Sequence, residues 1–446
     1  MSKQFLISIL GLCLFSACVK DKMPELIELD QEMEALIKKA SPTGQMEYYI
    51  LPDENDLSAI QQDQKNLLTP ERVELGKFLF YETGFAMGAV KESGKGTYSC
   101  ATCHIPEAGF RPGNFQGIAD GGQGFGLNGE DRRRHPEYVE SELDVQSARP
   151  LSLANVAFVK NTFWNGQFGA RGVNEDTEAV WDLREDTERN HLGFEAIETQ
   201  NFEGIESHRY TINEELIDAY GYRSHFDSAY PELVDSLRYS NYAGALALSA
   251  YIRTILTNKA PFQNWLKGQN SALGYDEKKG AILFFGKANC SNCHYEENLG
   301  SLEFHALGVK DMDQSPSFNA FANDRRNFGR GGFTLRPEDN FKFKVPGIYN
   351  VGDAPFYFHG ASKRNLKDLI DYKNLAQTEN ERVDQSIISE KFLPLGLTEE
   401  EKLQLIAFIE KALRDPEMER YAPESLLSGF CFPNNDAQSR IDLGCN

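Results

Sequence analysis

Two copies of one five-residue pattern constrain this chain more than any other feature of its sequence. The stretch from Cys100 to His104 reads C-A-T-C-H, and the stretch from Cys290 to His294 reads C-S-N-C-H. The pattern C-x-x-C-H is typical of covalent haem c attachment, in which both thiols form thioethers with the haem. The histidine that follows can reach the iron as a proximal ligand. The sequence therefore predicts two haem c groups, bound by Cys100, Cys103, His104, Cys290, Cys293 and His294.

Two other interpretations of the four cysteines are open. Two C-x-x-C pairs supply the ligands of a four-thiolate zinc site, but this leaves both histidines unused and joins distant parts of the chain. A disulfide within each pair is typical of thioredoxin-like redox enzymes, but no β-α-β pattern surrounds either motif. The haem interpretation accounts for the histidines as well as the thiols.

The composition limits the classes of function that the chain can serve. Its 446 residues allow two domains of ordinary size and a tail, and a hydrophobic content of 41% is sufficient for folded cores. Lysine and arginine number 46 against 67 aspartates and glutamates, which gives a net charge of −21. This acidity argues against nucleic-acid binding. It favours association with a basic partner protein, or it serves solubility alone.

The N-terminus has the pattern of an export signal. A basic Lys3 precedes an apolar run over residues 5–15, which is too short to span a membrane, and small residues follow before Cys18. Small residues directly before a cysteine resemble a bacterial lipobox. We therefore predict a lipoprotein signal peptide over residues 1–18 and lipidation of Cys18, with the protein anchored to a bacterial membrane in the periplasm or at the cell surface. The alternative is a plain secretory peptide cleaved nearby.

The remaining sequence predicts a mainly α fold with long loops and little β-structure, built from two cytochrome c-like haem domains. Apolar residues fall at helical spacing over 26–37, 241–257 and 276–287, and a capping box begins a helix at Thr398. Thr69 with Pro70 predicts another helix start. We divide the chain into a tether (19–68), a first haem domain (69–235), a second haem domain (236–420) and a tail (421–446).

Two further cysteines lie in the predicted tail. The chain has eight cysteines, of which one lies in the signal peptide, one in the lipobox and four in the haem motifs. Cys431 and Cys445 remain, and in an oxidising compartment we expect them to form a disulfide. Two free thiols are the alternative.

Beyond these motifs, residues 69–415 resemble the bacterial di-haem cytochrome c peroxidases and the related MauG family. The two C-x-x-C-H motifs carry the resemblance together with five other stretches in the same order. These stretches are L-G-K-F-L-F at 75–80, F-W-N-G at 163–166, G-A-I-L-F-F at 280–285, F-K-V-P at 343–346 and A-P-F-Y-F-H-G at 354–360. The family usually has F-W-D-G-R at the second of these stretches.

The resemblance implies an enzyme. The haem held by His104 would reduce hydrogen peroxide to water, and the haem held by His294 would receive electrons from a small cytochrome c or cupredoxin. Trp164 would lie between the two haems. Alternatives are a MauG-like enzyme that oxidises a protein or an organic substrate, and a di-haem electron carrier without catalysis.

The resemblance also implies a distal acid/base, because peroxide cleavage requires a group that moves a proton between the two oxygens. The family has a glutamine followed about ten residues later by a glutamate in an E-M pair. Gln200 matches the glutamine, whereas the E-M pair is absent and Glu206 and His208 stand near its place. Either residue is a candidate acid/base. His135 is the only candidate for the family's resting-state distal histidine.

The resemblance leaves the ligands of two metal sites undecided. The peroxidases bind the second haem with a methionine after the H-G stretch, and MauG uses a tyrosine there. Here Tyr372 is the first candidate, Lys373 the second and Met312 the third. The family also binds calcium between the haems, partly through backbone carbonyls of a T-A-P stretch, which corresponds to Asp353-Ala354-Pro355. The family's calcium-binding asparagine is replaced by Arg149.

Overall fold

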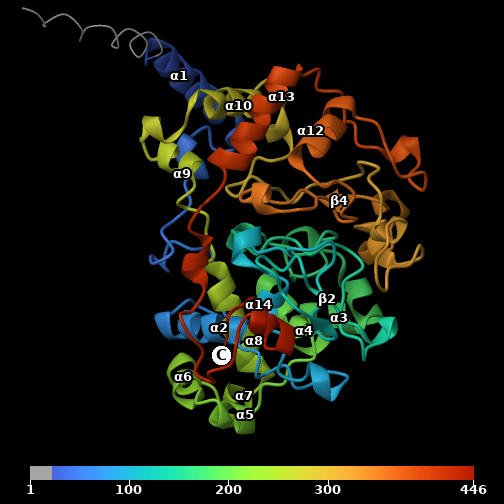
Figure 1. The fold of residues 1–446 in the computed structure, drawn as a ribbon. Helices are drawn as coiled ribbons and strands as arrows, with labels where there is room; N and C mark the ends of the chain where they lie inside the picture. The colour runs from blue at the N-terminus through green and yellow to red at the C-terminus, as the bar shows by residue number, and fades with distance from the viewer. Residues whose placement is uncertain (1–22, 446) are drawn as a thin grey trace, which may run out of the picture.

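The computed structural model describes residues 23–445 and is mainly helical, so the predicted fold class is confirmed. Within that range the β-structure consists of two antiparallel pairs of two-residue strands. Strand β1 (Gly122–Gln123) pairs with β2 (Arg133–Arg134), and β3 (Phe304–His305) pairs with β4 (Phe343–Lys344). Figure 1 shows one group of helices in the lower half of the view and a second group in the upper half.

The first group of helices forms around α8 (Asn241–Arg253). The helices α2 (Pro70–Tyr81) and α4 (Ala196–Ser207) pack against it, and α6 (Arg223–Ala229) packs against α2. The side chain of Thr69 accepts the Arg72 amide at 3.3 Å, so α2 begins where the cap and proline predicted. Together these helices enclose the larger apolar core of the molecule.

Helix α8 lies in the first core, although the sequence analysis assigned it to the second domain. Every residue from Ala243 to Arg253 is buried, so the helix has no solvent-facing side. A helix that is apolar on all sides occupies the centre of a core rather than its edge. The boundary near residue 235 therefore does not separate the two packed units.

The second group of helices is built on α10 (Tyr275–Phe285). It packs against α13 (Glu399–Ala407), which continues as a π-helical turn over Phe408–Ala412, and α12 (Leu366–Leu375) packs beside α13. Helix α9 (Pro261–Leu266) completes this core. The smaller helices of the two groups are α3 (Glu185–Glu188), α5 (Glu214–Ala219), α7 (Asp235–Arg238), α11 (Gly331–Thr334) and α14 (Ala437–Asp442).

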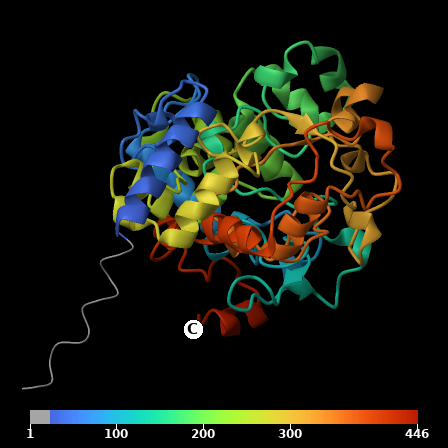
Figure 2. The same cartoon turned by 90° about the horizontal axis from the view of Figure 1, so that it is seen from above.

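The N-terminal helix α1 (Met23–Ala40) packs on the second group. Asp30 fixes it there, because its carboxylate accepts the indole N–H of Trp265 at 2.7 Å and pairs with the Lys278 ammonium at 2.6 Å. Figure 2 shows the blue α1 beside the yellow α10. The segment predicted as a tether thus contributes to the second core.

The C-terminal tail packs on the first group, at the far end of the chain from α1. Cys431 and Cys445 form a disulfide, the pairing that the sequence analysis expected. The Ser99 hydroxyl, next to the first C-x-x-C-H motif, donates to the Pro433 carbonyl at 2.8 Å. A buried ion pair between Arg132 and Asp436 (3.3 Å) holds α14 against the same unit.

In each unit, a glycine lies at the point where two helices cross with their backbones in close contact. A Cβ atom added at Gly76 of α2 would lie 1.9 Å from the Ala247 carbonyl oxygen of α8. One added at Gly280 of α10 would lie 2.0 Å from the Gln404 carbonyl oxygen of α13. Each glycine sits on the helix that precedes a C-x-x-C-H motif, so backbone contact positions both motifs.

We expect Gly76→Ala to lower the free energy of unfolding by about 1–3 kcal/mol, since the new methyl group must push two backbones apart. Denaturant unfolding of the haem-loaded protein measures the loss. Gly244→Ala on α8 is the control, because its methyl group comes close only to the flexible tip of Ile212 and makes an ordinary contact with Ile205. Equal stability of Gly76→Ala and the parent protein would contradict this account of the crossing.

None of the helices in residues 23–445 has the length and apolar character needed to cross a membrane. Cys18 and the predicted signal peptide lie outside the described residues.

Candidate functional site

The first C-x-x-C-H motif presents its histidine with one nitrogen engaged and one free. Cys100–Thr102 form a 3₁₀ turn, and the next turn of chain brings His104 Nδ1 to 3.0 Å from the Phe110 carbonyl oxygen. A carbonyl only accepts, so Nδ1 carries the proton and Nε2 keeps its lone pair. Burial lowers the pKa of His104 to about 4, which keeps the ring neutral.

The second motif repeats this arrangement. Cys290–Asn292 form a 3₁₀ turn, and His294 Nδ1 lies 2.8 Å from the Leu299 carbonyl oxygen. Burial lowers the pKa of His294 to about 4 as well. A backbone acceptor on the outer nitrogen is the arrangement that orients an imidazole toward a metal. Both histidines are therefore prepared to bind iron through Nε2.

The four motif cysteines are free and do not form a zinc site. Neither C-x-x-C pair is bridged by a disulfide. Among residues 23–445, the one group of three or more potential metal ligands is Cys293 with Glu303 and His305. The two motifs therefore do not bring four thiols together, and the zinc interpretation of the sequence is wrong.

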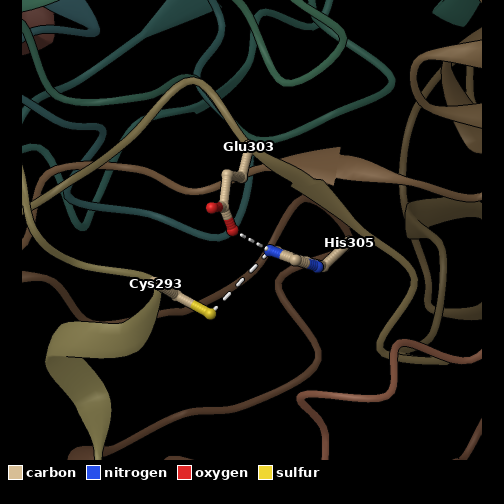
Figure 3. A group of neighbouring side chains, drawn as sticks. All are labelled: Cys293, Glu303 and His305. Carbon is tan, nitrogen blue, oxygen red and sulfur yellow. Dashed lines mark hydrogen bonds and ion pairs between the residues drawn. The ribbon is translucent and has the colours of Figure 1, made fainter.

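The cluster at Cys293 is explained without a metal ion. His305 Nε2 lies 2.8 Å from Glu303 and 3.8 Å from the Cys293 sulfur, as Figure 3 shows. The Lys391 ammonium pairs with the same glutamate at 2.6 Å, so the carboxylate already has two cationic or polar partners. Haem attachment would convert the Cys293 thiol to a thioether and remove the strongest ligand of the group.

A cavity opens beside each motif. The first, of about 320 Å³, is lined by Cys100, Cys103 and His104, and the second, of about 250 Å³, by Cys290, Cys293 and His294. The two cavities share a wall that contains Trp164, and its place between two haems stays a prediction. Its indole N–H donates to the Arg149 carbonyl at 2.7 Å, and its ring lies edge-on to His359 with centroids 6.2 Å apart.

Buried cations around the cavities fit the charge of haem. Arg149 lines both cavities, donates to the carbonyls of Pro112, Asn114 and Phe115, and leaves its Nε without a partner. Lys344 also lines both, and its ammonium donates to the Asn161 carbonyl at 2.7 Å.

These two cations have no anionic partner in the described part of the chain. Neither forms an ion pair with a carboxylate there, and burial lowers the pKa of Arg149 to about 9 and that of Lys344 to about 7. Buried charges need a counter-charge. The propionates of two haems would supply it, so the residues present suit the predicted cofactor.

Helix α4 supplies the polar side of the first cavity. Gln200, Glu203 and Ser207 follow each other at helical spacing and all line the cavity. Burial, reinforced by the negative charge of Asp186, raises the pKa of Glu203 to about 7. This carboxyl group therefore exchanges its proton near neutral pH.

His208, at the end of α4, lines the same cavity and is paired with a carboxylate. Its Nδ1 lies 2.8 Å from the Asp144 carboxylate. Burial alone would lower the pKa of His208, but the charge of Asp144 and this hydrogen bond outweigh it, so the pKa is raised. The imidazole can thus carry a proton at the cavity wall.

Glu206 does not belong to the site. It is exposed, pairs with Arg189 and does not line the first cavity, so its position does not support the predicted catalytic role. Glu203, one helical turn earlier, does line the cavity and was not among the candidates from the sequence. The signal was present in the spacing, because Gln200 and Glu203 are three residues apart and share a helix face.

His135 also lies away from the cavities. It follows β2, its backbone N–H donates to the Gly121 carbonyl at 2.8 Å, and it lines neither cavity. A distal role for this histidine is therefore not supported.

The three candidate axial ligands differ in whether they line the second cavity. Tyr372 does not line it, and its hydroxyl donates to the Leu307 carbonyl at 2.5 Å, so this arrangement does not support its predicted role as the ligand. Met312 is fully buried and does not line the cavity either. Lys373, one residue after the tyrosine, does line it.

Asp353 already has partners of its own. Its carboxylate pairs with Arg414 at 2.5 Å and accepts the Asn350 amide at 3.0 Å. Pro355 lies two residues further on, and the structure gives it no contact that indicates a cation. Calcium binding at Asp353 and Pro355 stays a prediction.

Two equivalent units, each with a C-x-x-C-H motif beside its own cavity, define a di-haem oxidoreductase. The family model described as di-haem cytochrome c peroxidase matches residues 70–271. The chain is thus similar to the di-haem cytochrome c peroxidase and MauG family.

Individual relatives cover most of the chain. MauG of Methylorubrum extorquens is 26% identical over 80% of this chain and 82% of its own length. Cytochrome c551 peroxidase of Pseudomonas aeruginosa is 26% identical over 70% of this chain and 73% of its own length. Among solved structures, a MauG-like protein associated with microbial copper homeostasis has the same fold, with a TM-score of 0.56, 21% identity, and coverage of 84% of this chain and 96% of that one.

Proposed function

We propose that this protein reduces hydrogen peroxide to water at the haem held by His104, with electrons that enter through the haem held by His294. The observation that carries the proposal is the difference between the two cavities. Gln200, Glu203 and the His208–Asp144 pair line the first. The second is lined by Lys373, by apolar groups such as Phe358 and Phe392, and by polar groups engaged elsewhere, such as His359 with Asp311.

The bound haem supplies the redox chemistry, and the side chains supply binding and protons. Each peroxide takes two electrons and two protons and gives two molecules of water. A side chain must therefore take the proton from one peroxide oxygen and return it to the other. Glu203 is suited to this, because both of its protonation states are populated near neutral pH. Gln200 orients the peroxide by hydrogen bonding, and His208 holds a second proton against Asp144.

Electrons come from a small redox protein such as a cytochrome c or a cupredoxin. Trp164 lies in the wall shared by the cavities, which supports a role in transfer between the haems. The net charge of −21 favours a basic donor, which the field of an acidic protein steers toward it.

Steady-state turnover tests this function. The di-haem protein is mixed with a reduced small cytochrome c and hydrogen peroxide, and oxidation of the donor is followed by absorbance. Two donor molecules oxidised for each peroxide consumed is the expected result. A protein whose haems, oxidised or half-reduced, leave peroxide unchanged would overturn the proposal.

The rate should depend on pH through Glu203. Because the pKa of this carboxyl is about 7, the base form is lost as the pH falls below that value. We expect kcat/KM for peroxide to decrease by about tenfold per pH unit below 7 and to level off above it. A pH profile of Glu203→Gln provides the comparison. Persistence of the same acid limb in that variant would assign it to another group.

Oxidation of a protein or organic substrate is the second candidate. The observation that favours it is the similarity to MauG, together with a second cavity that no methionine side chain lines within the described range. Peroxide consumption that persists without oxidation of a small redox donor, and that modifies a co-purified protein, would support it over the first proposal.

We also propose that the chain is exported and anchored by a lipid on Cys18. The basic, apolar and small-residue regions before this cysteine support the proposal. Metabolic labelling with a radioactive fatty acid tests it, with Cys18→Ser as the control. Labelling of both proteins or of neither would contradict lipidation at this residue.

A further inference from the structure

We propose that the side-chain amine of Lys373 is the sixth ligand of the iron in the second haem, opposite His294. This inference deepens the proposed function, since it requires a haem on the second motif. It does not depend on whether the first haem reacts with peroxide. Four observations support it. The lysine lies on the helix face that lines the cavity, and its amine has no partner. The other amines and imidazoles of the cavity have partners, and an amine ligand suits the chemistry of this haem.

Helix α12 directs one face into the second cavity. Leu366, Leu369, Ile370 and Lys373 all line it, and they are spaced as one face of a helix. Lys373 is the only one of the four with an atom that can bind a metal. The neighbouring Asp371 belongs to another face, where it pairs with Lys367 and Lys402.

The amine of Lys373 has no polar partner in the described chain. No hydrogen bond or ion pair engages it in residues 23–445, and its contacts are aromatic. Its Nζ lies 5.9 Å from the ring centroid of Phe358 and 5.5 Å from that of Phe392. An amine in apolar surroundings without an acceptor is costly to bury. A lone pair bound to iron would compensate for this cost.

The other amines and imidazoles around the second cavity have partners. Each amine or imidazole there besides His294 and Lys373 has a partner of its own. These pairs are His305 with Glu303 and Ser389, His359 with Asp311, Lys344 with the Asn161 carbonyl and Lys391 with Glu303. Lys373 is therefore the available nitrogen ligand.

An amine ligand would give the second haem a distinct task. Two nitrogen ligands close the iron to peroxide, which confines the reaction with peroxide to the first cavity. An axial methionine raises a haem potential, and an amine in its place favours the ferric state. The second haem would then pass electrons onward readily.

The test uses the full-length protein with both haems bound, without peroxide. Ferric EPR and absorption spectra are recorded for the parent protein, Lys373→Met and Lys373→Ala. Lys367→Met is the matched control, because it lies on the exposed side of the same helix. Mass spectrometry first verifies that each protein carries two haems.

We expect the parent protein to show a low-spin second haem without the charge-transfer band of thioether ligation. Lys373→Met should gain that band and shift the potential of the second haem upward. Lys373→Ala should lose the low-spin signal of this haem and give a high-spin or exogenously ligated one. Lys367→Met should match the parent. An unchanged low-spin signal in Lys373→Ala, with no thioether band in Lys373→Met, would overturn the proposal.

A measurement on the parent protein tests the proposal even if the variants fail to bind haem. Lysine labelled with ¹³C is incorporated, and NMR of the reduced protein is used to find side-chain methylene signals shifted far upfield by the haem ring current. One lysine with such signals supports the assignment, and their absence contradicts it. Because no step involves peroxide, failure here is distinguishable from failure of the proposed peroxidase activity.

Discussion

Glu203→Gln should lower kcat/KM for hydrogen peroxide by about 10²–10⁴-fold, the usual contribution of a general acid/base. Glutamine keeps the shape and the hydrogen-bonding capacity of the side chain but cannot exchange a proton with peroxide. Glu203 lines the first cavity, and its pKa is raised to about 7 by burial and by the charge of Asp186. Stopped-flow mixing of the reduced protein with peroxide measures the loss directly.

Glu206→Gln is the matched control for this variant. It makes the same chemical change one turn further along α4, but on an exposed residue that pairs with Arg189 outside the cavity. Its kcat/KM should remain within about twofold of the parent value, since it changes no group at the reaction site. A larger loss in Glu206→Gln than in Glu203→Gln would return the acid/base role to Glu206, one of the two candidates from the sequence.

Arg253→Ala should lower the free energy of unfolding by about 3–5 kcal/mol, the cost of leaving a buried charge without its partner. The side chain of Arg253 is 2% exposed, and its guanidinium contacts the fully buried carboxylate of Glu198 at 2.6 Å. The pair connects α8 to α4, the helix that carries the distal groups. Denaturant unfolding of the haem-loaded protein measures the loss.

Arg223→Ala is the control, because its ion pairs with Asp218 and Glu214 are at the surface and should contribute no measurable stability. The double variant Arg253→Met with Glu198→Leu separates charge from packing. It should recover much of the stability lost by Arg253→Ala, because no buried charge is left unpaired. Equal instability of the single and double variants would show that lost packing, and not the orphaned carboxylate, accounts for the effect.

The sequence predicted features that depend on neighbouring residues. The C-x-x-C-H motifs form the expected turns beside cavities, and Thr69 caps α2 as its pairing with Pro70 indicated. The pairing of Cys431 with Cys445 followed from elimination among the cysteines. Each of these features is determined within a few residues or by a simple count, so tertiary packing did not alter it.

The sequence was least informative where the orientation of a helix face had to be known. Glu203 and Glu206 are both acidic and lie on one helix, and only the packing of α4 on α8 determines which of them faces the cavity. Tyr372 and Lys373 are adjacent, so a rotation of about 100° around α12 exchanges their surroundings. The resemblance to a family located the candidate residues on α4 and α12 to within a few positions. It did not determine which face of each helix points into its cavity.

Each end of the chain packs on the unit that lies farther from it in the sequence. Helix α1 completes the core of the second unit through Asp30, whereas the last residues, Cys431 to Cys445, cover the backbone beside the first motif. The second unit therefore uses both the first helix and residues 260–413, and the first unit uses the tail that follows the second unit in the sequence. A ribosome or an export channel that delivers the chain from its N-terminus leaves the first unit unfinished until the final residues emerge. The second unit has all of its residues by then, so we expect the first unit to finish folding last, although it begins earlier in the sequence.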